Sequence, residues 1–165
     1  QVPWHQVRAA PVILVTGPED FLAERASRLL RDALRAQDPS LEVHDLRADS
    51  YQPGELVTLA SPSLFGEPRL IRVDAASTMS DAFLEEALEY IAAPADDTVV
   101  MIRHSGGVRG KKLLDAIRAG TGGGIEVLCT ELKRDSDRAD FAAAEFRTAG
   151  RPIAPAALRA LVNAF

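Results

Sequence analysis

Short apolar runs alternate along the chain with longer segments in which apolar residues recur every three or four positions. The runs have the length and continuity of strands buried on both faces, whereas the recurring spacing is that of amphipathic helices. We expect strands at residues 12–15, 43–46, 70–73, 98–102 and 125–128, and helices at residues 21–34, 54–60, 80–92 and 110–119. This alternation predicts a mainly parallel α/β sheet that is covered by helices.

Residues that favour helix ends support three of these helices. Asp20 and Ser80 are suited to cap the first and third helices, because their side chains can accept hydrogen bonds from free backbone amides. Pro39 follows the first helix and Gly120 follows the last, and both residues commonly end helices. The first helix is expected to bury an apolar stripe that begins at Phe21.

The character of the sequence changes after the last expected strand. Residues 133–138 form a charged link, and residues 137–149 and 155–164 are rich in alanine with helical spacing. We therefore expect a domain boundary near residue 134. Residues 1–134 would form the α/β domain, and residues 135–165 would be the start of a helical, lid-like domain that is truncated by the end of the chain.

Composition narrows the classes of function. Nineteen basic against 24 acidic side chains give a net charge of −5, so the overall charge does not indicate nucleic-acid binding, although a local basic patch remains open. The one cysteine, Cys129, excludes an internal disulfide and is expected to be a buried, small apolar residue. No apolar run reaches the roughly 18 residues that cross a bilayer, so we expect a cytoplasmic protein without membrane contact. The sequence starts at Gln1 rather than Met, and we expect a fragment of a longer protein.

The first strand and helix occupy the position of a phosphate-binding loop, but they lack its residues. A Walker loop reads G-x-x-x-x-G-K-[ST], and after Gly17 this chain has Leu22, Ala23 and Glu24 where the second glycine, the lysine and the hydroxyl residue belong. Only the first glycine of a Rossmann fingerprint is present. We therefore expect no cofactor and no nucleotide hydrolysis by this chain.

Other chemical signals are weak. Asp74 follows a strand as a Walker B aspartate would, but Ala75 stands at the position of the catalytic glutamate, so a turn is the better interpretation. His5, His44 and His104 lie on separate elements without the spacing of metal ligands, and no catalytic or metal-binding residue is assigned. Two alternatives stay open: a nucleotide-binding NTPase with a non-standard loop, and an α/β module that binds a small ligand near Asp74 and His104.

One basic cluster lies at the start of the last expected helix. Arg109, Lys111 and Lys112 stand where the helix dipole disfavours cations. Such placement can indicate a phosphate or an acidic partner, so these residues are candidates for contact with DNA or an acidic protein. A solvated helix start whose charges only aid solubility remains an equal alternative.

Two large apolar residues stand outside any periodic element. Leu64 and Phe65 lie between Pro62 and a Gly-x-Pro sequence, in the stretch SPSLFGEPRLIRV that begins at Ser61. Such a pair can pack back on the sheet edge or on the helix at residues 54–60. Alternatively, it can enter a pocket of another protein, where a buried aromatic and aliphatic pair binds strongly.

Several motifs occur in an order that resembles a known family, the delta subunits of bacterial DNA polymerase III clamp loaders. The resemblance covers residues 11–165, and its motifs are specific in their order and spacing rather than one by one. They are LVTGPEDFL at residues 14–22, SPSLFG at residues 61–66, HSGG at residues 104–107 and GKK at residues 110–112, followed by the acidic-aromatic pairs at residues 140–141 and 145–146 and the apolar pairs at residues 157–158 and 161–162.

The resemblance implies both a fold and a role. The α/β domain would be AAA+/RecA-like but would have lost nucleotide binding, so the chain would be no enzyme alone although it belongs to a DNA-directed DNA polymerase holoenzyme. Its role in DNA replication would be to bind the sliding clamp (beta subunit) and to open or trap the ring for loading onto DNA. Leu64 and Phe65 would enter a hydrophobic pocket of the clamp, with Ser63 and Gly66 in support. Delta prime and tau/gamma subunits would bind through a C-terminal domain absent from these residues, and primed DNA would be contacted indirectly.

Overall fold

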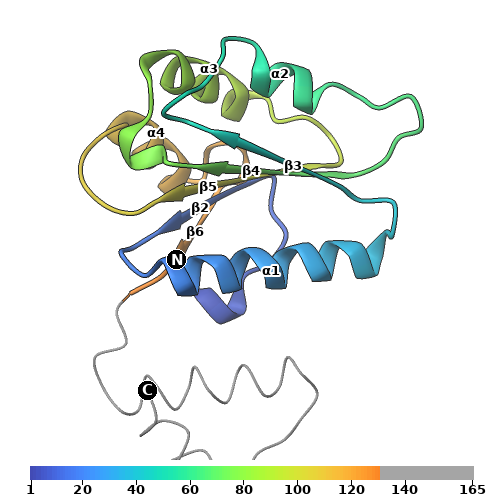
Figure 1. Ribbon diagram of the computed structural model, residues 1–165, viewed down its shortest axis with the longest axis horizontal. Coiled ribbons are helices and arrows are strands. Elements are labelled where there is room, and N and C mark those ends of the chain that lie inside the picture. Colours follow the sequence, from blue (N-terminus) through green and yellow to red (C-terminus); the bar gives the residue numbers. More distant parts are fainter. Residues whose placement is uncertain (131–165) are drawn as a thin grey trace, which may run out of the picture. The chain divides into compact units, whose positions relative to one another are not determined.

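The strands form one parallel sheet of six in the described part of the chain, residues 1–130 of a computed structural model (Figure 1). Their order across the sheet is β1-β6-β2-β5-β4-β3, and each neighbouring pair runs parallel. The strands are β1 (Val2–Pro3), β2 (Val12–Thr16), β3 (Glu42–Arg47), β4 (Arg69–Asp74), β5 (Thr98–His104) and β6 (Ile125–Leu128). A connection that contains a helix joins each strand to the next along the chain, as parallel pairing requires.

All five expected strands are present, and β1 is an addition that the sequence pattern did not predict. It has two residues and pairs Val2 with Val127 at the sheet edge. An element this short carries no periodic signal. The continuous apolar runs of β2, β4 and β5 are explained by their central places in the sheet, where helices cover both faces.

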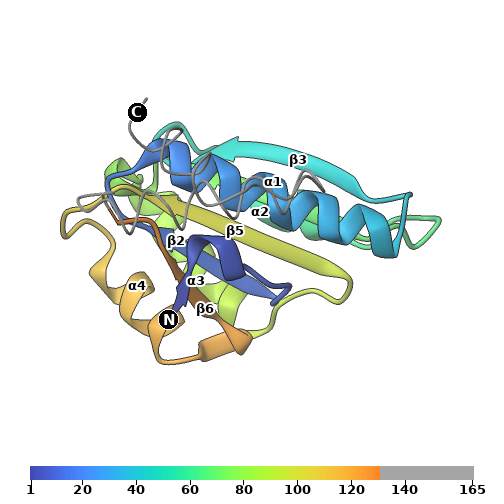
Figure 2. The same cartoon turned by 90° about the horizontal axis from the view of Figure 1, so that it is seen from below.

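Helices cover the two faces unequally. They are α1 (Asp20–Gln37), α2 (Glu55–Ala60), α3 (Asp81–Ala92) and α4 (Lys111–Arg118), with short 3-10 turns at Trp4–Gln6, Ala76–Thr78 and Thr121–Gly123. One face carries α1, and the opposite face carries α2, α3 and α4 (Figures 1 and 2). The expected α/β fold class, a parallel sheet covered by helices, is therefore confirmed.

The larger core lies between the sheet and the three-helix face. Alternate residues of the strands, among them Leu14, Ile71 and Ile102, are buried against Phe83 of α3 and Leu113 of α4. On the α1 face the next residues along the strands meet a narrower stripe of α1. One helix cannot cover the whole width of the sheet, and charged side chains therefore occupy part of that face.

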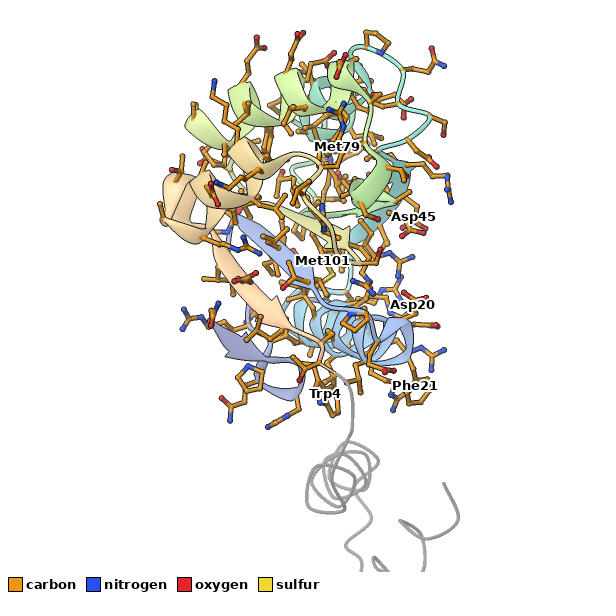
Figure 3. The ribbon with its side chains drawn as sticks, turned by 90° about the vertical axis from the view of Figure 1, so that its left-hand side faces the viewer. Trp4, Asp20, Phe21, Asp45, Met79 and Met101 are labelled. Carbon is orange, nitrogen blue, oxygen red and sulfur yellow. The ribbon has the colours of Figure 1, made fainter. Side chains whose placement is uncertain are left out.

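Two details of the helix prediction are resolved by the structure. Ser80 caps α3 as expected, since its Oγ accepts a hydrogen bond from the Phe83 amide at 3.2 Å. Asp20 is not the cap of α1: the helix begins at Asp20, and the flanking Glu19 makes no side-chain cap bond. Phe21 is 59% exposed at the outer side of the first turn, so the buried stripe begins at Leu22 instead (Figure 3).

The predicted boundary near residue 134 and the helical domain at residues 135–165 lie outside the described residues, as do the residue pairs between positions 140 and 162 that contribute to the resemblance. The compact unit that the structure describes comprises Gln1–Cys129. Within residues 1–130, no helix has the length and apolar character needed to cross a membrane.

Candidate functional site

The Leu-Phe pair lies at the tip of the loop that joins α2 to β4, residues 61–68, here called the α2–β4 loop. Leu64 is 98% exposed and Phe65 is 86% exposed. The loop extends beyond the end of α2 at the right of Figure 1. The alternative in which the pair packs back on the sheet or on α2 is therefore wrong, and both side chains lie in solvent.

The tip of the loop has a defined backbone shape. The Ser63 hydroxyl accepts a hydrogen bond from the Phe65 amide at 3.2 Å and donates one to the Glu67 carboxylate. The Gly66 amide donates to the Ser63 carbonyl at 3.3 Å, and Gly66 has a φ of 69°, which a residue with a side chain rarely adopts. The Ser63 hydrogen bond lowers the pKa of Glu67, so that its carboxylate remains charged and accepting. Leu64 therefore lies in a turn that these hydrogen bonds close.

The end of the loop is fixed to the sheet. The buried Arg69 guanidinium donates to the Leu59 carbonyl in the last turn of α2 at 2.5 Å, which ties that helix to the start of β4. The Arg69 amide donates to the Asp97 carbonyl, and the Pro68 carbonyl accepts from the Glu42 amide, each at 2.9 Å. The first residue of β3 and the residue before β5 thus hold the end of the loop.

The helix that precedes the loop is also fixed. The Tyr51 hydroxyl donates to the Glu86 carboxylate of α3 at 2.6 Å and accepts from the Leu56 amide at 3.0 Å. Burial, together with the Glu86 carboxylate, raises the pKa of Tyr51 to about 12, so that this hydroxyl keeps its proton. Val57 on the outer side of α2 is 61% exposed, and the Ser61 hydroxyl donates to its carbonyl at 2.7 Å. Both ends of the loop are therefore attached to rigid elements.

The connection between β2 and α1 packs closely against the backbone of Cys129. The Cys129 amide donates to the Thr16 carbonyl at 2.7 Å, and a Cβ at Gly17, whose φ is 120°, would overlap the Cys129 carbonyl. At the first residue of α1, Asp20 accepts from Arg103 of β5 at 2.8 Å. A carboxylate therefore stands where a bound phosphate would meet the helix start, and this arrangement does not favour an anion.

A cleft of about 570 Å³ lies beside α1 at the carboxyl ends of β3, β4 and β5. Its charged lining is internally paired: Arg72 makes two hydrogen bonds to Asp45, at 2.7 and 2.9 Å, and Arg103 binds Asp20. Figure 3 shows Asp20 and Asp45 on the same side of the molecule. Because Arg72 and Arg103 already bind carboxylates of the protein, a small anionic ligand would have to displace these carboxylates.

The two polar residues singled out at strand ends serve turns. The Asp74 carboxylate accepts from the Ala75 amide at 2.9 Å, which supports the turn interpretation. His104 is buried: its Nε2 donates to the Arg109 carbonyl at 2.9 Å, and its Nδ1 accepts from the Gly106 amide at 3.3 Å. Both ring nitrogens are therefore used to shape the loop before α4. In residues 1–130, no three His, Cys, Asp or Glu side chains are grouped as metal ligands would be.

The basic cluster lies at the start of α4, as expected, but two of its three cations have acidic partners. Arg109 donates to Asp81 at 2.6 Å and to the Met79 carbonyl at 2.9 Å. Lys111 lies 3.7 Å from Asp115, one turn further along the helix. Lys112 is exposed. Such surface pairs are weak, so all three side chains remain able to exchange partners.

Four residues of the α2–β4 loop were predicted from the sequence as a candidate site, Ser63 to Gly66. The structural roles of Glu67, in the same loop, and of Arg69, the first residue of β4, were not predicted. Glu67 looks like an ordinary surface charge before a proline. Arg69 precedes an apolar strand, so it gave no sign that its guanidinium is buried and bound to α2. The one sign of this turn in the sequence was that Ser63 and Glu67 lie four residues apart with Gly66 between them.

The sequence matches no protein-family model and no curated protein. Among solved structures it is similar to the Aeropyrum Pernix ORC2 protein, described in ADPNP-ADP complexes, with 11% identity and a TM-score of 0.48. The similarity covers 82% of this chain and 45% of that chain, so the present chain spans less than half of its length. A likeness this loose carries no argument about binding or activity, and the fold class rests on the observed sheet and helices.

Proposed function

We propose that this chain is a clamp-loader subunit of the delta type, which binds a ring-shaped sliding clamp during DNA replication. The observation that carries the proposal is the near-complete exposure of Leu64 and Phe65 on an anchored turn. The resemblance of the surrounding motifs to delta subunits supplies the identity of the partner. Exposed apolar pairs of this kind are costly to keep in water unless a partner buries them.

The free energy available from the pair is sufficient for a specific contact. Full burial of a Leu or Phe side chain is worth about 1.5–3 kcal/mol, so the two together contribute about 3–6 kcal/mol. Because tenfold in affinity corresponds to about 1.4 kcal/mol, removal of both side chains should weaken binding by about 100-fold or more. The anchored loop limits the entropy lost on binding.

The proposed role is not enzymatic. Neighbouring subunits would hydrolyse ATP, and this chain would bind the clamp and favour the open ring. A bound protein shifts a ring between closed and open states only by its difference in affinity for them, so contacts beside the pair must distinguish the two states. The outer side of α2, with Val57, and the segment Glu67 to Arg69 adjoin the loop and are the proposed places for them.

The further partners are proposals that follow from the same resemblance. Delta prime and tau/gamma subunits would bind through a C-terminal domain, in the cytoplasm. Arg109, Lys111 and Lys112 would contact primed DNA or an acidic surface. Contact with DNA phosphates would appear as an affinity that falls steeply with salt concentration.

The decisive experiment measures the affinity of the chain for the sliding clamp of the same organism by surface plasmon resonance. Leu64→Ala/Phe65→Ala is compared with the wild type and with Val108→Ala, a control in which another apolar side chain, 85% exposed, is shortened. We expect the double variant to lose about 100-fold or more in affinity. The control should bind as the wild type does.

Thermal unfolding of each variant accompanies the affinity measurement. Both substituted side chains lie in solvent, so the melting temperature should not fall. Wild-type affinity of the double variant would refute the proposed function. Titration with ATP and ADP tests the alternative of a nucleotide-binding NTPase, and saturable binding that depends on residues 17–25 would favour that alternative.

A further inference from the structure

We infer that Glu67 is a positioning residue, which acts through Ser63 to keep Leu64 and Phe65 in the conformation that docks. This inference rests on the proposed function, because it concerns how the same site is prepared for its partner. Glu67 itself would not need to contact the partner. Its effect would be on the fraction of molecules in which the tip is ready to bind.

The chain of contacts runs from Glu67 to the apolar pair in two steps. The Glu67 carboxylate accepts the Ser63 hydroxyl hydrogen, which fixes the direction of that hydroxyl. The oxygen lone pair is thereby turned toward the Phe65 amide, from which it accepts at 3.2 Å. The charge on Glu67 strengthens this arrangement, because hydrogen bonds to an ionised acceptor are about twice as strong as neutral ones.

Among the described residues, Glu67 is the one charged group that makes a hydrogen bond to the tip. Leu64 is 98% exposed and Phe65 is 86% exposed, so side-chain burial cannot hold either residue in place. The remaining bond of the turn, from the Gly66 amide to the Ser63 carbonyl, is long at 3.3 Å. In contrast, the base is fixed at Pro68 and Arg69 by hydrogen bonds to β3, to the residue before β5 and to α2. The conformation of the tip therefore depends on the bond between Ser63 and Glu67.

The affinity for the clamp depends on the fraction of molecules in which the tip is ready to bind. When a binding-competent conformation is only partly populated, the apparent dissociation constant rises in inverse proportion to the populated fraction. Loss of the Glu67 carboxylate would allow the tip to sample other conformations. If the competent fraction falls to between a third and a tenth, affinity falls by about three- to tenfold.

The test uses Glu67→Ala and two conservative variants that keep the hydrogen bond. In Glu67→Gln the amide oxygen can still accept from Ser63, and in Ser63→Thr the hydroxyl is retained. We expect Glu67→Ala to bind the sliding clamp about three- to tenfold more weakly and Ser63→Thr to stay close to the wild type. Glu67→Gln should lie between Glu67→Ala and the wild type, because its neutral oxygen accepts a weaker hydrogen bond. Glu85→Ala, which removes an exposed carboxylate of α3, is the matched control and should bind as the wild type does.

A second readout needs no partner. Hydrogen exchange of the Phe65 and Gly66 amides in the free chain should accelerate in Glu67→Ala and accelerate less in Glu67→Gln. Unchanged exchange in Glu67→Ala would overturn the inference. So would equal weakening of clamp binding in Glu67→Ala and Glu67→Gln, because that result would show that binding depends on the charge of Glu67 and not on its hydrogen bond to Ser63.

The outcomes separate this inference from the function on which it rests. Wild-type binding by Glu67→Ala, with binding lost in Leu64→Ala/Phe65→Ala, refutes the positioning role and leaves the proposed function intact. Wild-type binding by Leu64→Ala/Phe65→Ala refutes the proposed function, and the positioning role then has no partner to serve.

Discussion

A buried carboxylate on β6 allows a quantitative test of how the sheet is held together. Glu126 is 4% exposed, and its oxygens accept hydrogen bonds from Gln1 and Thr16 at 2.9 Å and from the Arg118 Nε at 3.0 Å. This one side chain therefore connects the strand β6 to the N-terminal residue, to the end of β2 and to the last turn of α4. We expect Glu126→Gln, which keeps the shape and removes the charge, to lower the free energy of unfolding.

The magnitude follows from the partners. A hydrogen bond to a charged group contributes about 1.5–3 kcal/mol, and a buried hydroxyl such as that of Thr16 costs about 1–3 kcal/mol when it loses its acceptor. Breaking a fully buried ion pair typically costs about 3–5 kcal/mol. Because the Arg118 side chain is 43% exposed and can turn to water, this range is an upper bound for the cost of Glu126→Gln. We expect Glu126→Gln to cost about 1–3 kcal/mol at neutral pH.

The same carboxylate makes the loss dependent on pH. Burial alone would raise the pKa of Glu126, but the hydrogen bonds from Gln1, Thr16 and Arg118, with the charge of Arg118, outweigh burial and lower it. A group whose pKa is lower in the folded state stabilises the fold fully above its unfolded pKa, which for glutamate is about 4.3. That stabilisation is lost as the pH falls through the folded pKa. The difference between the wild type and Glu126→Gln should therefore narrow below about pH 4.3.

Urea unfolding followed by circular dichroism measures this difference at neutral and acid pH. Glu85→Gln removes an exposed carboxylate, and as the control it should change stability by no more than about 0.5 kcal/mol. The midpoint for Glu126→Gln should fall while the slope with urea stays the same. Equal stability of Glu126→Gln and the wild type at neutral pH, or a difference that does not change in acid, would refute the reasoning.

Two further predictions concern the end of β2 and the cysteine beside it. Gly17→Ala should destabilise the fold by about 2 kcal/mol or more, because the new Cβ would overlap the Cys129 carbonyl at a φ that favours glycine, and a urea midpoint equal to the wild type would contradict this. The Cys129 thiol should react with a disulfide reagent at pH 8 only when the chain unfolds, because burial raises its pKa to about 11. Rapid labelling of the folded chain would show that the thiol is accessible.

The elements that could be predicted from the sequence are those whose signal is local. Short, mainly apolar runs predicted β2, β4, β5 and β6, since a strand with helices on both sides is largely apolar. The edge strand β3, with His44 and Asp45 inside it, gave a weaker signal. Ser80 was identified as a cap because its amide partner lies three residues away. Leu64 and Phe65 were placed in a loop because proline and glycine interrupt any regular element around them.

Features that depend on distant partners could not be predicted in this way. Phe21 has the spacing of a buried residue, but α1 meets the sheet along a stripe that leaves it 59% exposed. Glu126 stands in an apolar run and is satisfied by residues 110 and 125 positions earlier in the chain. The orientation of the Ser63 hydroxyl depends on Glu67, and no propensity indicates that bond.

The sequence by itself determined the alternation of strands and helices, the absence of Walker residues after Gly17, and the place of Leu64 and Phe65 outside any regular element. The tertiary structure decided which strands are neighbours, which face each helix covers, and that the Leu-Phe pair stands in solvent on an anchored turn. The physical reason is the range of the interactions. Local hydrogen bonding and side-chain periodicity depend on residues that are close together in the sequence. The exposure of a side chain and the partners of a buried charge depend on segments that folding brings together.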